Sequence, residues 1–108
     1  MRYSAELTDR VAEIFKVLSE PMRLKILDGL RDGEKNVTEL IKITNSQQAN
    51  VSKHLGLMRK AGVVVCRRKG LNIFYSLKEK RFFALCDSVC DYLAKRHAEE
   101  GELFEKET

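Results

Sequence analysis

The segment that most constrains the fold runs from residue 46 to residue 62, SQQANVSKHLGLMRKAG. Val51, Leu55 and Met58 recur at the spacing of one helical face, which predicts an amphipathic helix whose apolar stripe packs on a core. The other face carries small, hydroxyl or cationic side chains: Ala49, Ser52, Lys53, Gly56 and Lys60. Amides crowd the first turn of the segment, at Gln47, Gln48 and Asn50. Amides at a helix N-terminus can reach base edges and phosphates, although a solvated polar face explains this helix alone equally well.

The distribution of charge favours a nucleic-acid partner. Between Glu39 and Glu79 the chain has no acidic residue, whereas the whole chain has a net charge of only +4. The cations of this interval are Lys42, Lys53, Arg59, Lys60, Arg67, Arg68, Lys69 and Lys78. Charge of one sign gathered in this way is typical of a protein that binds a polyanion. A surface without such a partner normally mixes both signs.

Length and composition predict a single soluble domain over residues 1–108, of a size that often gains stability by dimerising. Apolar residues make up 44% and charged residues 33%, which is typical of a globular protein. Because neither a long apolar run nor a signal peptide is recognisable, we expect a cytoplasmic protein with no membrane partner. The three cysteines are then expected to be free thiols, and the acidic segment from about residue 97 to residue 108 to be a frayed tail.

Two helices are expected before the segment described above. The first covers residues 4–18 on the helical spacing of its apolar residues. Ser19 is expected to cap the second helix, with Pro21 in its first turn, and Gly33 to lie at or just past its end. The expected core residues of the second helix are Leu24, Ile26 or Leu27, and Leu30.

A helix-turn-helix is expected next. Asn36 and Glu39 have the spacing of a capping box, which predicts a short third helix. Thr44 and Asn45 then predict a tight turn into the helix of residues 46–62. A short helix, a turn of a few residues and a helix with a polar outer face together form the helix-turn-helix arrangement.

After Gly62 the apolar period changes to that of strands. The run VVVCRR, a turn at Lys69–Gly70 and the alternating LNIFYSL predict a two-stranded hairpin. Its tip carries Arg67, Arg68 and Lys69, which favours a wing that contacts phosphates or enters a minor groove. A solvated turn kept basic for solubility is the alternative.

A last helix is expected over residues 80–98. Its apolar stripe consists of Phe82, Leu85, Cys86, Val89 and Leu93. Because the earlier helices should already close the core, this stripe predicts a two-fold dimer seam. The expected fold is therefore mainly α with a small β-hairpin, a winged helix-turn-helix of five helices and a two-stranded wing.

Three segments, in this order, carry a resemblance to a known family: LSEPMRLKIL at 18–27, QANVSKHL at 48–55, and RRKG leading to FY at 67–75. Together they make the chain resemble the ArsR/SmtB family of winged-helix transcriptional repressors over roughly residues 11–93. The resemblance implies a homodimer that is built through the first and last helices. It also implies repression by binding an imperfect palindrome in double-stranded DNA, with release when a metal, metalloid or reactive sulfur effector binds. No enzymatic activity and no required cofactor are implied.

The sensor sites most typical of the family do not fit this chain. Where the family has a cysteine-rich pair before the recognition helix, this chain has Asn36 and Thr38. The same Asn36 breaks the cysteine pair of the persulfide-sensing members. The positions that match the zinc site of the last helix are Glu79, Arg81, Tyr92 and Lys95. Such a set cannot form a tetrahedral zinc site.

Cys86 and Cys90 remain as candidate effector residues. Their i, i+4 spacing places both thiols on one side of the last helix, about 6 Å apart at Cβ. Two thiolates so placed could bind arsenite or another soft metal, or could be oxidised or bridged by sulfur. Packing as small apolar side chains is the alternative. His97 lies too far along the helix to join them within one chain. Cys66, in the hairpin, is expected to pack, with a role as a third arsenic ligand as the alternative.

The predicted DNA contacts fall into two groups. Base-edge contact is assigned first to Gln48, Ser52 and Lys53, and next to Gln47, Asn50 and His54. Phosphate contact is assigned to Arg59, Lys60, Arg67, Arg68 and Lys69. Three alternatives stay open at this point: the same repressor without cysteine sensing, a thiol redox protein that uses Cys86 and Cys90, and a winged helix that binds protein.

Overall fold

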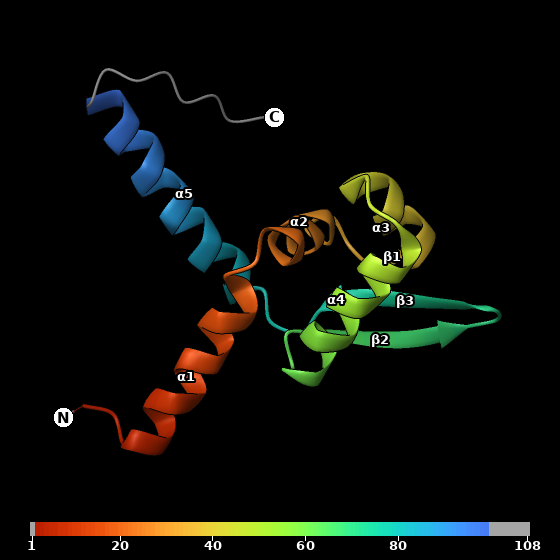
Figure 1. Cartoon of the computed structure of the whole chain (residues 1–108), viewed down its shortest axis with the longest axis horizontal. Helices are drawn as coiled ribbons and strands as arrows, with labels where there is room; N and C mark the ends of the chain where they lie inside the picture. Colours follow the sequence, from red (N-terminus) through yellow and green to blue (C-terminus); the bar gives the residue numbers. More distant parts are fainter. Residues whose placement is uncertain (1, 100–108) are drawn as a thin grey trace.

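Five helices and a small antiparallel sheet make up the computed structural model, which describes residues 2–99 (Figure 1). The helices are α1 (Ala5–Leu18), α2 (Pro21–Gly29), α3 (Val37–Thr44), α4 (Gln48–Lys60) and α5 (Arg81–Glu99). The strands are β1 (Lys35–Asn36), β2 (Val64–Lys69) and β3 (Asn72–Leu77), in the order β1-β3-β2. The predicted winged helix-turn-helix with five helices is confirmed.

Polar side chains fix the starts of α1 and α3, and the sequence predicts the cap of α3. The Ser4 hydroxyl accepts a hydrogen bond from the backbone N–H of Leu7 at 3.1 Å. Asn36 and Glu39 form the predicted capping box, because each side chain accepts from the other residue's backbone N–H, at 2.8 and 3.1 Å. Asn45 then adopts a left-handed conformation with φ 53°, which ends α3 and begins the turn into α4.

The start of α2 differs from the prediction. Ser19 ends α1 instead, where its hydroxyl donates to the carbonyl oxygen of Lys16 at 2.7 Å. Glu20 caps α2 by accepting from the backbone N–H of Arg23 at 3.2 Å. The physical reason is Pro21, whose fixed φ and missing N–H suit the first helical position, so the cap is the residue directly before it.

The core lies where α2, α3 and α4 meet and where β2 begins. Its most deeply buried side chains are Ile26, Leu27, Leu40, Val51, Leu55, Met58, Val63 and Val64. The predicted stripe of α4 is confirmed, since Val51, Leu55 and Met58 are all 0% exposed. Leu24 was wrongly predicted to be buried: it is 40% exposed, because it lies on the side of α2 that faces a pocket beside α5.

The sheet has one strand more than predicted. Lys35 pairs with Tyr75 and Asn36 with Phe74, so β1 lies along the edge of β3 and joins the wing to the segment before α3. A strand of two residues is too short to show alternation, which is why the sequence does not reveal it. β2 and β3 form the predicted hairpin, and its turn contains Gly70 at φ 63°.

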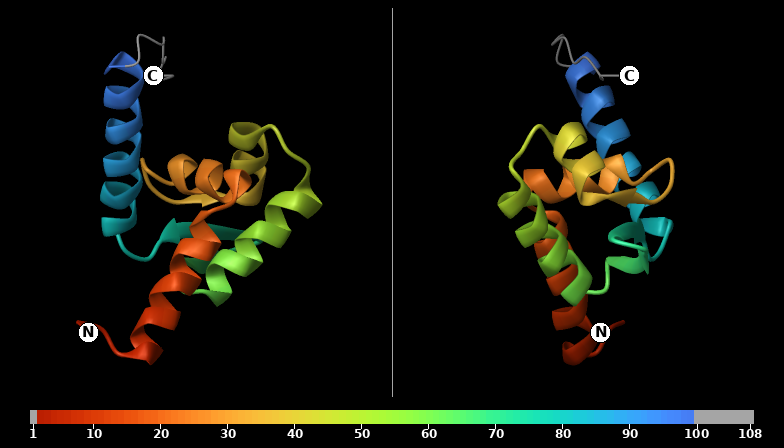
Figure 2. Two further views of the ribbon diagram at one scale, coloured as in Figure 1. Left: turned by 60° about the vertical axis from the view of Figure 1, so that its left-hand side comes forward. Right: turned by 90° about the vertical axis from the view of Figure 1, so that its right-hand side faces the viewer.

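Two long helices extend away from this centre. Figure 2 shows that α1 and α5 extend from the centre in opposite directions. The molecule measures 50 × 40 × 21 Å along its principal axes. No residue of α5, all of which the structure describes, is buried. α5 continues to Glu99, so the start of the predicted frayed tail is helical, and residues 100–108 lie outside the described residues. Among residues 2–99 no helix combines the length and apolarity needed to cross a membrane.

We predict that Leu55→Ala lowers the free energy of unfolding by about 2–5 kcal/mol, because it removes a fully buried side chain at the centre of the core. Leu57→Ala, on the same helix at a side chain that is 40% exposed, is the matched control and should cost less than about 1 kcal/mol. Urea denaturation followed by circular dichroism at one fixed protein concentration measures both. Equal losses would contradict the assignment of the α4 stripe to the core.

Candidate functional site

The outer face of α4 presents most of the predicted base-contacting residues to solvent. Gln47 and Gln48 are exposed at the start of the helix, and Ser52 and Lys53 are exposed one turn later. Arg59 and Lys60 are exposed in its last turn. Because the opposite face of α4 is the buried stripe, these polar side chains lie together on the side away from the core. The helix therefore offers amides, a hydroxyl and cations to a groove.

Asn50 has a more restricted place. It is half-buried, and its Nδ2 donates to the Ser46 hydroxyl at 2.9 Å. This hydrogen bond lies across the first turn of α4, so the amide helps to order the turn between α3 and α4.

His54 is a correction to the predicted interface. The residue is only 7% exposed, and its Nδ1 accepts a hydrogen bond from Nε of Arg23 at 3.2 Å. Burial removes its ring from the predicted DNA-contacting surface. The apolar spacing contained the signal, since residue 54 lies three after Val51 and four before Met58, and so falls beside the stripe.

The three cations at the tip of the wing lie in two different environments. Arg68 and Lys69 are exposed at the end of β2. Arg67 instead forms a two-pronged ion pair with Glu34, in which Nε donates to Oε2 at 2.8 Å and Nη2 to Oε1. Its guanidinium also lies over the ring of Phe74, 5.5 Å from the centroid.

The Glu34–Arg67 pair changes the electrostatics of the wing. The Arg67 guanidinium lowers the pKa of the Glu34 carboxyl, and Glu34 in turn raises the pKa of Arg67, mainly through their hydrogen bonds. Arg67 therefore already has an anionic partner before any phosphate approaches. Glu34 lies 33 residues earlier in the chain, so the acid-free interval of the sequence contains no sign of it.

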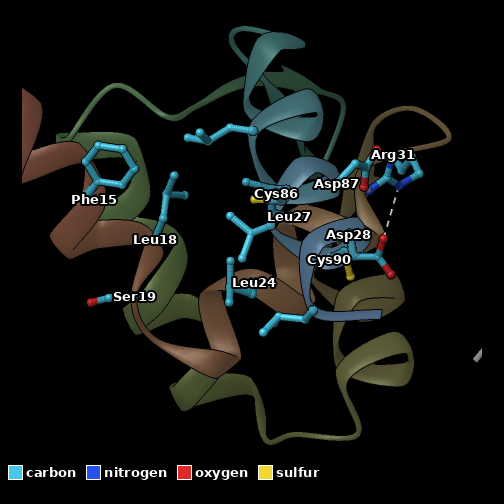
Figure 3. A pocket seen from close by; sticks show the side chains of 13 residues that line it. Phe15, Leu18, Ser19, Leu24, Leu27, Asp28, Arg31, Cys86, Asp87 and Cys90 are labelled. Atoms are coloured by element: carbon cyan, nitrogen blue, oxygen red, sulfur yellow. Dashed lines mark hydrogen bonds and ion pairs between the residues drawn. The ribbon is translucent and has the colours of Figure 1, made fainter. Parts of the chain in front are cut away.

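A pocket of about 890 Å³ lies between α1, α2 and α5 (Figure 3). Most of its lining is apolar and includes Phe15, Leu24, Leu27 and Leu85. Cys86 and Cys90 line it from α5, and their sulfur atoms are visible in Figure 3. The structure thus brings the two candidate effector thiols to one apolar pocket. Cys66 is half-buried in β2 opposite Tyr75 and does not line it.

The two thiols differ in environment. Cys86 is half-buried, and burial is the main cause that raises the pKa of its thiol; the carboxylate of Asp87 raises it further. Cys90 is exposed. Within the part of the chain that the structure describes, no three His, Cys, Asp or Glu side chains gather as a metal site, so one subunit offers a soft ion only the two thiols.

Arg31 forms hydrogen bonds with two carboxylates that line the pocket near Cys86. It donates two hydrogen bonds to the Asp87 carboxylate, each at 2.9 Å, and one to Asp28 at 3.1 Å. It also lies over the Phe83 ring at 4.8 Å. These contacts join the C-terminal end of α2 to α5, and Asp87 is the main cause of the raised pKa of Arg31. Sequence spacing cannot reveal a pair that is 56 residues apart.

Residues 20–65 match the family model described as bacterial regulatory protein, arsR family. The transcriptional repressor SdpR of Bacillus subtilis is 38% identical over 64 residues, which cover 59% of this chain and 71% of SdpR. An uncharacterized HTH-type transcriptional regulator of Mycobacterium tuberculosis, Rv0081, is 40% identical over 67 residues, 61% of this chain. The match spans only 59% of that relative's length.

Solved structures extend the match over most of the chain. The crystal structure of Rv0081 has a TM-score of 0.79 at 33% identity and covers 90% of this chain and 98% of its own. The solution structure of the homodimeric winged helix-turn-helix DNA-binding domain of Mb0332, from Mycobacterium bovis, has a TM-score of 0.75 at 33% identity. The match covers 84% of this chain and 87% of the Mb0332 chain. The chain therefore belongs to the ArsR family of bacterial regulatory proteins and has their winged helix-turn-helix fold.

Proposed function

We propose that this protein is a homodimeric transcriptional repressor that binds double-stranded DNA in a sequence-specific way. The observation that carries the proposal is the separation of the two faces of α4: the stripe toward the core is fully buried, and the face away from it holds exposed amides and cations. The wing adds Arg68 and Lys69 beyond the same surface. In this proposal α4 enters a major groove and the wing tip follows the neighbouring phosphates or minor groove.

Within this interface the residues have different roles. Gln48, Ser52 and Lys53 contact base edges, with Gln47 and Asn50 beside them. Phosphate contact belongs to Arg59, Lys60, Arg68 and Lys69. Arg67 is a weaker candidate for a phosphate contact than the sequence indicates, because Glu34 already neutralises it.

Exposed apolar side chains on the two long helices support the homodimer. On α1, Leu7, Val11 and Phe15 are 45%, 40% and 53% exposed. On α5, Val89 and Leu93 are 54% and 37% exposed. A second copy that covers both helices would bury these side chains, and Mb0332 is described as homodimeric. Such a dimer would place two α4 helices on the half-sites of an imperfect palindrome, about one DNA turn apart.

The effector of the proposed repressor acts on Cys86 and Cys90. Both thiols line the pocket between α1 and α5, the helices proposed to form the dimer, so a group bound there could change how the two recognition helices are spaced. Arsenous acid would condense with both thiols, forming two As–S bonds and releasing two waters with no redox change. A polysulfide would instead oxidise the two thiols by two electrons: one of its zero-valent sulfur atoms would form the S–S–S bridge, and another would take the electrons and the two thiol protons and leave as hydrogen sulfide.

The thiol redox enzyme is the weaker alternative. A redox enzyme of this kind needs a thiol with a lowered pKa, whereas the pKa of Cys86 is raised by its burial. The relatives, moreover, are named as transcriptional regulators and repressors. A repressor of the same fold without cysteine sensing is the second alternative, and the response of the operator complex to arsenite and polysulfide separates the two.

We predict that Lys53→Ala raises the Kd for a selected operator duplex by about five- to fifty-fold, and the Kd for random duplex by less, because a base contact is lost. The operator would first be selected from a random-sequence pool, and Kd measured by fluorescence anisotropy. Lys16→Ala, at an exposed lysine of α1, is the control and should change neither value. Equal losses on operator and random duplex would count against base contact by Lys53.

We predict that the two neighbouring arginines of the wing differ in their effect on salt dependence. Arg68→Ala should reduce the slope of log K against log salt by about one, as expected for one lost phosphate contact. Arg67→Ala should change the slope less, because Glu34 already offsets its charge. Glu34→Gln should strengthen binding to every duplex by freeing Arg67. An unchanged slope in Arg68→Ala would remove Arg68 from the phosphate contacts.

We predict that arsenite or a polysulfide donor releases the reduced protein from its operator, and that Cys86→Ser and Cys90→Ser each abolish the release. Cys66→Ser is the matched control and should respond like the unchanged protein, because Cys66 lies outside the pocket. Because the pKa of Cys86 is raised, release by polysulfide should become faster as the pH rises from 7 to 9. Tight operator binding that neither reagent disturbs would support the repressor without cysteine sensing.

A further inference from the structure

A short series of contacts connects the end of α1 with the recognition helix α4. Nη1 of Arg23, on α2, donates to the carbonyl oxygen of Val17 in the last turn of α1 at 3.2 Å. Nε of the same guanidinium donates to Nδ1 of His54 on α4, also at 3.2 Å. We propose that the Arg23–His54 hydrogen bond is a pH-sensitive positioning link: protonation of His54 breaks it, and specific DNA affinity falls in mild acid. This inference rests on the proposed DNA-binding function.

The geometry defines the protonation state in which the link exists. A guanidinium carries only donors and stays charged, so Nδ1 of His54 must be the acceptor. The ring is therefore neutral, with its proton on Nε2. With the residue 7% exposed, water offers little replacement for this bond.

Protonation of His54 would replace its hydrogen bond from Arg23 with one to Glu20. A proton on Nδ1 would face the Nε–H of Arg23, donor against donor and cation against cation. Oε2 of Glu20 lies 3.8 Å from the same Nδ1 and can accept this proton's hydrogen bond after a small movement. Glu20 also caps α2 through the backbone N–H of Arg23, so both partners of the ring belong to the first turn of α2.

Among the residues that the structure describes, the recorded polar partners of the His54 ring are Arg23 and Glu20. Glu20 and Arg23 face the ring from the start of α2. The core residues that α3 and β2 contribute, among those the structure describes, do not titrate: Leu40, Thr44 and Val64. On α4 itself, the neighbouring cation Lys53 is exposed. The ring of His54 is thus the group of this link that can take up a proton.

The position of the link explains why its loss would affect DNA reading. α1 belongs to the proposed dimer seam, and α4 carries the proposed base contacts. Arg23 holds both, so a shift of α4 against α1 would misplace the two recognition helices relative to the half-sites. The expected direction of the change in DNA affinity with pH distinguishes this link from a simple charge effect. An added positive charge on a DNA-binding protein ordinarily strengthens its binding to DNA, whereas this link predicts weakening as the pH falls.

The test uses the full chain, kept reduced, and a fluorescein-labelled duplex selected from a random pool at pH 8. Anisotropy gives Kd for this duplex and for a random duplex between pH 6 and pH 8 at constant ionic strength. We expect the specific Kd to rise about two- to fourfold from pH 8 to pH 6, because an ordinary imidazole is only partly protonated at pH 6, and the random Kd not to rise. His54→Asn, whose amide oxygen can accept from Arg23 without titrating, should keep its pH 8 affinity at pH 6.

The chain has two histidines, which provides a matched control. His97→Asn, on α5, should retain the full pH dependence. If specific affinity stays level or improves in acid, or if His97→Asn removes the dependence, the proposal is overturned. Absence of specific binding already at pH 8 would instead contradict the proposed function.

A measurement without DNA tests the link itself, whatever the fate of the variants. Nitrogen-15 spectra of the histidine rings at pH 8 should show His54 with its proton on Nε2 and Nδ1 as acceptor. A proton on Nδ1 at pH 8 would overturn the proposal.

Discussion

The structure depends first on the burial of one face of α4. Val51, Leu55 and Met58 are fully buried where α2, α3 and β2 meet, and each contributes about 1.5–3 kcal/mol by leaving water. Because a helix that buries one face must expose the other, the same packing orients Gln48, Ser52 and Lys53 outward. The proposed DNA-reading surface is thus a direct consequence of how the core is closed.

Three arginines then connect parts of the chain that the core alone does not fix. Arg67 joins the wing to Glu34, Arg31 joins the end of α2 to Asp87 on α5, and Arg23 joins α1, α2 and α4. Each guanidinium makes at least two directed hydrogen bonds, for which its planar fork is well suited. Most of these contacts are exposed, so they are expected to affect orientation more than stability.

The two long helices are mostly exposed: α1 has one buried residue, Leu18, and α5 has none. α5 has only half-buried or exposed residues, and most of its apolar stripe, from Leu85 to Leu93, lines the pocket that contains Cys86 and Cys90. A second subunit that covers α1 and α5 would therefore also cover the thiols. Dimerisation and effector chemistry would share one surface in the proposed repressor, which gives a physical route from a modified thiol to the spacing of the recognition helices.

The sequence by itself determined the helical and strand periods, the capping box at Asn36 and Glu39, and the buried stripe of α4, because these depend on residues a few positions apart. It also contained the family resemblance, which the comparisons confirmed. Only the tertiary structure decided that Glu34 neutralises Arg67, that His54 pairs with Arg23, and that β1 joins the sheet. Those features depend on contacts between residues about 30 to 40 positions apart, and no local pattern of side chains records which distant charges will meet when the chain folds.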